Sequence, residues 1–158
     1  MTLGIATFLF LHVMGAIAAF GPTFSTFPIV GQMAGREPQH SNFAARVNGR
    51  IFQVRVLPLA IFQGITGLVL IYLTGFDPFS QLWLGLGILL YVVAITYALT
   101  VQGPTGRRIA ELTAAPPPGA SGPPPELLAA VKRSRRGGMF LEALVVVIVI
   151  LMVTKPTL

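Results

Sequence analysis

The stretch that decides the fold is Leu3–Phe20, which reads LGIATFLFLHVMGAIAAF. It contains no Asp, Glu, Lys or Arg, and His12 is its one ionisable side chain. A run of about 20 apolar residues forms a helix long enough to cross the ~30 Å hydrocarbon layer of a bilayer, so this stretch predicts a membrane span. An imidazole inside that layer is costly unless a partner satisfies it, which makes His12 the first candidate functional residue.

The whole chain has the composition of a membrane protein. Its 158 residues are 54% hydrophobic and only 10% charged, with a mean hydropathy of +0.78. Soluble domains carry about 25% charged residues, so this chain lacks the side chains needed to cover a water-facing surface. It has no cysteine, which excludes disulfides and thiolate chemistry. We therefore expect a single membrane domain over residues 1–158.

Four apolar segments predict an all-α fold, a four-helix transmembrane bundle. The spans are expected at about residues 3–33, 51–74, 81–102 and 139–154. Pro22 and Pro28 each remove a backbone donor from the first span, which is therefore either one kinked helix or a span followed by a broken second piece. Ser41 or Asn42 is a candidate cap for a helix that continues into the second span.

The net charge of +6 is explained by membrane topology and not by a nucleic acid partner. Ten of the eleven Lys and Arg residues lie in two segments, 36–55 and 107–136. Cytoplasmic loops of membrane proteins carry an excess of these residues, so both segments are predicted to be cytoplasmic. Both termini then lie on the outer, periplasmic side. The chain is predicted to be a multi-pass protein of the bacterial inner membrane, in contact with the lipid bilayer.

Residues 105–138 form the longest segment outside the predicted spans and are expected to be a cytoplasmic loop. Residues 105–113 are expected to extend the third helix. Residues 114–125, AAPPPGASGPPP, form a proline-rich linker with no means of building a core. Residues 126–136 are either a short interfacial helix with its basic side chains toward lipid headgroups or a solvated basic loop.

Three polar side chains are predicted to lie near the middle of the bilayer. At a rise of 1.5 Å per residue, His12, Gln63 and Tyr91 fall at similar depths on the first three spans. We expect them to meet and to form the candidate binding site. His12 is then a hydrogen-bonded imidazole that holds helices together, a ligand of haem iron or another metal, or a proton relay, and the residues alone leave these alternatives open.

A second polar layer is predicted nearer the cytoplasmic side. Arg55, Tyr97 and Glu142 lie at similar depths on the second, third and fourth spans. Buried charges are tolerated in a membrane when they are paired, so an ion pair between Arg55 and Glu142 is expected. It is either a structural clasp or, through Arg55, an anion site for a group such as a porphyrin propionate.

The remaining conspicuous side chains have plainer interpretations. Tyr72, Phe79 and Trp83, near the turn between the second and third spans, are typical of an interfacial aromatic belt. His40 lies in a polar loop and is expected to be solvated. The sequence contains no phosphate-binding glycine loop, zinc-ligand spacing or pair of catalytic acids, which disfavours hydrolytic and group-transfer enzymes.

Short segments spread along the chain carry a resemblance to a known family. They are Leu11–Ile17 (LHVMGAI), Thr66–Leu68 (TGL) and Leu151–Pro156 (LMVTKP), together with Phe76-Asp77 before Trp83. In this order and spacing they resemble a family of small four-helix bacterial integral membrane proteins of unknown function. More remotely, the histidine of the first span and the terminal Lys-Pro are similar to HemJ-type protoporphyrinogen oxidases, which contain haem, and to copper-resistance D-like membrane proteins.

The remote resemblance implies haem b as a cofactor and His12 as its metal ligand. Together with the matched depths, it makes His12, Gln63, Tyr91 and Arg55 the candidate cofactor-binding residues. HemJ-type proteins carry a Lys near the start of the third span, where this chain reads QLWLG over residues 81–85. That difference favours a non-enzymatic role.

We therefore expect an accessory or cofactor-holding subunit of a membrane redox assembly, with other membrane subunits or a second copy of the chain as partners. The alternatives are a porphyrin-oxidising membrane enzyme and a copper or small-solute permease.

Overall fold

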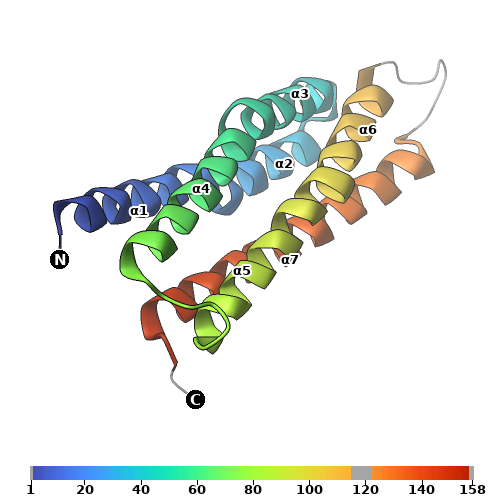
Figure 1. The fold of residues 1–158 in the computed structure, drawn as a ribbon. Helices are drawn as coiled ribbons and strands as arrows, with labels where there is room; N and C mark the ends of the chain where they lie inside the picture. Colours follow the sequence, from blue (N-terminus) through green and yellow to red (C-terminus); the bar gives the residue numbers. More distant parts are fainter. Residues whose placement is uncertain (1, 115–121, 157–158) are drawn as a thin grey trace.

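The computed structural model describes residues 2–114 and 122–156, and these are almost entirely helical (Figure 1). The α-helices are α1 (Leu3–Phe24), α2 (Thr26–Arg36), α3 (Ser41–Ile51), α4 (Leu57–Thr74), α5 (Leu82–Tyr97), α6 (Gly103–Ala114) and α7 (Pro125–Thr154). Within the described residues they join into four rods that are long and apolar enough to cross a membrane, namely Leu3–Arg36, Pro38–Thr74, Leu82–Ala114 and Pro125–Thr154. The all-helical, four-span prediction is confirmed.

The first rod is interrupted at Ser25 and not at either proline. α1 continues through Pro22 to Phe24, and the backbone leaves the helical region at Ser25 with φ −122° and ψ −66°. Pro28 lies in the first turn of α2, where a backbone N–H has no partner within the helix and its loss costs little. Of the two alternatives left open by the sequence, the structure has a long span followed by a second, shorter helix.

The second and third rods each contain one π-helical turn, η2 (Phe52–Val56) and η3 (Ala98–Gln102). A Cβ built on Gly103, the residue after η3, would lie 3.5 Å from the ring of Phe52, so this side chain of η2 reaches the end of η3. Neither Ser41 nor Asn42 caps α3 through its side chain. The Asn42 amide instead donates 2.8 Å to the carbonyl of Ala110 and so joins α3 to α6.

The fourth rod is one continuous helix of 30 residues, α7. This corrects the expectation that residues 126–136 form a separate interfacial helix or a loop. Pro125 is tolerated because it is the first residue of the helix, and the helix then runs without a break into the apolar span. Residues 115–121 of the proline-rich linker lie outside the described residues.

Close approach of α7 to the third rod depends on Gly137. A Cβ at this position would collide with the side-chain oxygen of Gln102 and would lie 2.9 Å from the Tyr97 hydroxyl. With the glycine in place, Gln102 donates 3.0 Å to the carbonyl of Ser134, and Tyr97 packs edge-to-face on Phe140.

The four rods associate as two pairs. α1 packs along α4, and α5 packs along α7, whereas the pairs meet mainly where α6 lies between α3 and α7 (Figure 1). We call this the basic end, because the two segments that hold ten of the eleven Lys and Arg residues fold there. Both ends of the described chain and the α4–α5 turn lie at the opposite end, which we call the terminal end (Figure 1).

A cluster of two aromatic rings and one cation lies at the terminal end. Trp83 is only 7% exposed and packs edge-to-face on Phe76, with ring centroids 5.8 Å apart. The ammonium group of Lys155 lies 5.5 Å from the centroid of the Trp83 ring system, a cation–π distance. Trp83 is therefore a packing residue, and its assignment to an interfacial belt was wrong. Tyr72 and Phe79 are 86% and 99% exposed, as such a belt requires.

Candidate functional site

The candidate site is the contact between His12 on α1 and two polar side chains of α4. His12 Nε2 lies 2.9 Å from the amide nitrogen of Gln63, and Nδ1 lies 3.0 Å from the hydroxyl oxygen of Thr66. The Thr66 hydroxyl is 3.1 Å from the carbonyls of Phe62 and Gln63 and donates to this pair. Its oxygen therefore accepts from His12 Nδ1–H, which leaves Nε2 free of hydrogen to accept from the Gln63 amide.

The spacing of polar residues along α4 places both partners on the face that meets α1. Gln63 and Thr66 are three residues apart and so lie on one side of the helix. Gln63 is 9% exposed and Thr66 is 1% exposed, which means that neither has lipid or water as an alternative environment. The predicted contact between His12 and Gln63 is present. Thr66 was not predicted as a site residue, although its spacing from Gln63 is a signal that identifies it.

Glycines on both helices make the contact possible. A Cβ at Gly67 would lie 3.1 Å from His12 Cε1, and one at Gly15 would lie 2.9 Å from the Gln63 side-chain oxygen. That oxygen is buried and has no conventional hydrogen-bond donor. A Cβ at Gly15 would replace one of the two Hα atoms of the glycine, so that Hα points at the Gln63 oxygen. Weak Cα–H···O contacts of this kind are found between packed helices.

Tyr91 lies near this cluster but does not reach His12. Its hydroxyl donates 2.9 Å to the carbonyl of Ala60, and it packs against the backbone at Gly64, where a Cβ would lie 2.5 Å from the hydroxyl oxygen. Tyr91 thus joins α5 to α4 one turn away from Gln63. The expectation that the three side chains meet holds for His12 and Gln63 and fails for Tyr91, which bonds to the backbone instead.

The expected ion pair between Arg55 and Glu142 does not form. Arg55 is exposed on η2, and Glu142 is partly buried on α7. The ion pairs between described residues are His40–Glu37, Arg108–Glu111 and Arg108–Glu126. Similar depth was the basis of the prediction, but α7 packs on α5 and α6 and not on η2. His40 is exposed, as expected.

Comparison with known proteins identifies the family. Residues 6–156 match the model of the family described as Predicted integral membrane protein (DUF2269). The chain belongs to this family. No curated protein and no solved structure matches the chain. The match agrees with the resemblance to a family of small membrane proteins, while the remoter resemblances to HemJ-type oxidases and copper-resistance D-like proteins gain no support from it.

In this DUF2269 protein the surroundings of His12 do not fit a haem or metal ligand. Coordination through Nε2 would displace the Gln63 amide, and coordination through Nδ1 would displace Thr66. Arg55 lies eight residues before Gln63, about 12 Å further along the helical axis, and is exposed. Across residues 2–114 and 122–156, no group of three or more His, Asp or Glu side chains is placed to hold a metal ion.

The same geometry disfavours passage of a solute past His12. The ring lies against the backbone of α4 at Gly67, and Gln63 lies against the backbone of α1 at Gly15. A solute could not pass between these helices without separating them. In this arrangement neutral polar groups hydrogen-bond to one another within an apolar layer. These bonds fix the rotation and the axial position of α1 on α4.

We expect the His12–Gln63 contact to be energetically coupled. In a double-mutant cycle with His12→Leu, Gln63→Leu and the double variant, the coupling free energy of unfolding in detergent should be about 0.5–2 kcal/mol, the range of interhelical hydrogen bonds in membranes. His40→Leu, which removes an exposed imidazole, serves as the control and should change stability by less than about 0.5 kcal/mol. Additive effects of His12→Leu and Gln63→Leu would show that the contact is not formed.

Proposed function

We propose that this DUF2269 protein is a non-catalytic, multi-pass subunit of a bacterial inner-membrane assembly. In this proposal it acts by packing the first rod against a helix of a partner membrane protein. The observation that carries the proposal is the pair Gly31 and Gly35 on α2. Both are exposed, and a Cβ built on either meets no atom within 4 Å.

The first rod has other open glycines, Gly4 and Gly21, but only Gly31 and Gly35 are four residues apart, and the glycines that pack inside the protein show what a glycine contact does. Gly15, Gly64 and Gly67 each lie against a side chain of a neighbouring helix. Lipid tails are as apolar as leucine, so membrane helices associate through close backbone approach and not through the hydrophobic effect, and a glycine pair four residues apart favours that approach. Gly31 and Gly35 have this spacing, and no helix among the described residues packs against them.

The hydrogen bonding of His12 supports a non-catalytic role. The partners of its ring nitrogens are the Gln63 amide and the Thr66 hydroxyl, which itself donates to backbone carbonyls, so neither partner titrates near neutral pH and, among the described residues, His12 lies in no chain of titratable groups. A metal ion would have to displace one of these partners. The redox character of the assembly was expected from the resemblance to haem proteins. It stays a prediction that depends on haem binding.

Partner packing predicts a specific crosslink. A photoreactive residue at Gln32, which is exposed and directly follows Gly31 on α2, should crosslink in native membranes to one other membrane polypeptide. The double substitution Gly31→Ile and Gly35→Ile should abolish the product, because the larger side chains prevent backbone approach. Gly4→Ile, at another open position of the first rod, is the matched control and should leave it unchanged.

The mass of the product decides the identity of the partner. A product of twice the 16.8 kDa chain would mean that the partner is a second copy. The proposal would be contradicted if Gln32 crosslinked only to lipid, or if the double Ile variant crosslinked as well as the parent protein.

The proposed orientation places both termini on the periplasmic side and the basic end in the cytoplasm. The chain has no cysteine, so single cysteines report position without background. Ser80→Cys, in the exposed α4–α5 turn, should react with a membrane-impermeant maleimide in spheroplasts. Gly122→Cys, exposed before α7, should react only after the membrane is permeabilised. The reverse pattern would invert the topology.

The hydrogen bonds of His12 also predict the response to haem. Haemin added to the purified protein should give no Soret band that depends on His12, because binding would break the contacts with Gln63 or Thr66. The measurement is an absorption titration of the parent protein and of His12→Ala. A Soret band that forms with the parent protein and is lost in His12→Ala would restore the haem-holding role.

A further inference from the structure

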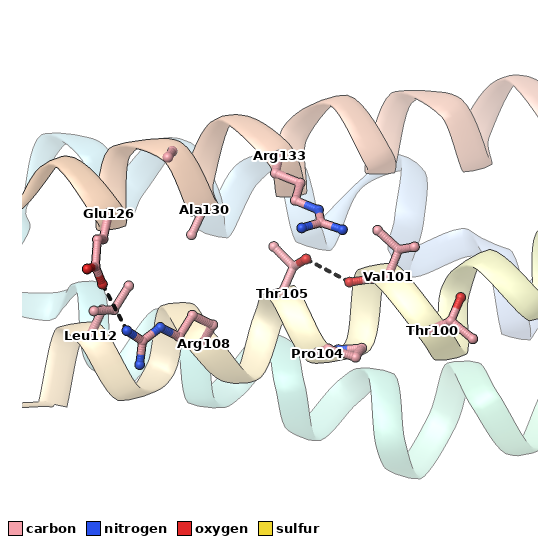
Figure 2. A pocket seen from close by; sticks show the side chains of 10 residues that line it. Thr100, Val101, Pro104, Thr105, Arg108, Leu112, Glu126, Ala130 and Arg133 are labelled. Atoms are coloured by element: carbon pink, nitrogen blue, oxygen red, sulfur yellow. Dashed lines mark hydrogen bonds and ion pairs between the residues drawn. The ribbon is translucent and has the colours of Figure 1, made fainter.

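A groove at the basic end lies between α6 and the first half of α7 (Figure 2). Its volume is about 430 Å³, and much of its wall is apolar, formed by Val101, Pro104, Leu112, Ala129 and Ala130. Three charged side chains also line it, namely Arg108, Glu126 and Arg133. We call it the headgroup groove.

The two arginines of the headgroup groove differ in their partners. Arg108 is held by Glu126 at 2.8 Å and by Glu111 at 3.3 Å. Arg133 has no carboxylate partner among the described residues, and Figure 2 shows its guanidinium reaching from α7 toward Thr105 on α6. The groove therefore presents one guanidinium fixed by carboxylates and a second whose donors are available to a ligand.

The wider electrostatic setting is strongly positive. Residues 100–138 contain six Lys and Arg residues and two Glu residues, which gives this segment a net charge of +4. A guanidinium recognises phosphate through paired N–H donors, so the free group in this setting favours an anion of the phosphate class.

A second groove continues from the first toward the terminal end. It has a volume of about 320 Å³ and is a shallow strip on one rod, because its lining residues, Val92, Val93, Thr96, Tyr97 and Thr100, all belong to α5 and η3. Thr100 lines both grooves, so the two are contiguous. The hydroxyl of Thr100 donates to the carbonyl of Thr96, which leaves mainly apolar surface along this second stretch. We call it the tail groove.

We propose that the two grooves bind one anionic phospholipid, with its phosphate at Arg133 and an acyl chain along the tail groove. A free phosphate ion would use the arginine but not the apolar continuation on α5. A neutral phospholipid would use the continuation but would bring no net charge to Arg133. Basic recesses beside membrane helices are where anionic headgroups bind, and the geometry of these grooves joins such a recess to the apolar span.

The test compares lipids and variants by native mass spectrometry of the delipidated full-length protein in detergent. Phosphatidylglycerol should bind more tightly than phosphatidylcholine with the same acyl chains. Arg133→Gln should weaken phosphatidylglycerol binding about tenfold, because it removes the charge-assisted hydrogen bonds to the lipid phosphate. Lys132→Gln removes the same charge one residue away, outside the groove, and should change binding less than twofold.

A second pair of variants tests the acyl chain. Thr100→Phe should fill the junction between the grooves and weaken phosphatidylglycerol binding several-fold while leaving every charge in place. Leu99→Phe, on the neighbouring exposed position that lines neither groove, is the control. Inorganic phosphate in large excess should not displace the lipid. Thermal unfolding of all four variants should match the parent, because the substituted side chains are exposed.

Each contrary result overturns the proposal in a different way. Equal losses in Arg133→Gln and Lys132→Gln would mean diffuse attraction to the basic end and not a site. Equal binding in Thr100→Phe and Leu99→Phe would remove the tail groove from the proposal. Displacement by inorganic phosphate would identify a free-anion site, and equal binding of the two lipids would remove the role of charge.

Discussion

The structure depends on one constraint, which is that polar groups in the hydrocarbon layer must find partners within the protein. His12 meets it with two hydrogen bonds to α4, one from the Gln63 amide and one to the Thr66 hydroxyl. Both bonds are formed only at one rotation and one height of α1, since the donor and acceptor positions of an imidazole are fixed on opposite sides of the ring. Apolar packing alone does not give such precision, because lipid competes for every apolar surface. The rotation and axial position of α1 on α4 are thus determined by three side chains and by the glycines that leave room for them.

This specification has consequences for the rest of the fold. One side of α4 is taken up by the contact between His12 and Gln63. A different side of α4 contacts α5, through the hydrogen bond from the Tyr91 hydroxyl to the Ala60 carbonyl. α5 is then free to pack along α7, where Gly137 and Gly87 allow close approach to Gln102 and Met152. The two pairs are drawn together at the basic end by α6, through the contact of Asn42 with Ala110. The result is two tight helix pairs joined at one end.

The sequence was sufficient to predict four helical spans and the His12–Gln63 contact, because span length and axial depth both follow from counting residues. Depth is only one coordinate of a helical residue, and other predictions made from depth failed because depth does not give the side of the helix on which a residue lies. Arg55 and Glu142 share a depth but belong to helices that do not pack together. Trp83 has the depth of an interfacial residue, yet its ring turns inward onto Phe76. The rotation of a helix depends on which side chain of a neighbouring helix packs on each of its glycines, as Gln63 packs on Gly15. The spacing of residues along one helix does not reveal which helix is the neighbour.

The distribution of polar groups along the bilayer normal follows the cost of exposing them to hydrocarbon. The middle of the molecule uses neutral groups, an imidazole, an amide and hydroxyls, because each can be satisfied by one or two hydrogen bonds. Charges gather at the basic end, where Arg108 is held by two carboxylates and the α6–α7 groove opens beside them. The terminal end has one basic residue, Lys155, and its charge lies over the rings of Trp83 and Phe76. The other ten Lys and Arg residues lie in the two segments at the basic end, so the end with most of the positive charge is also the end that carries the proposed lipid site.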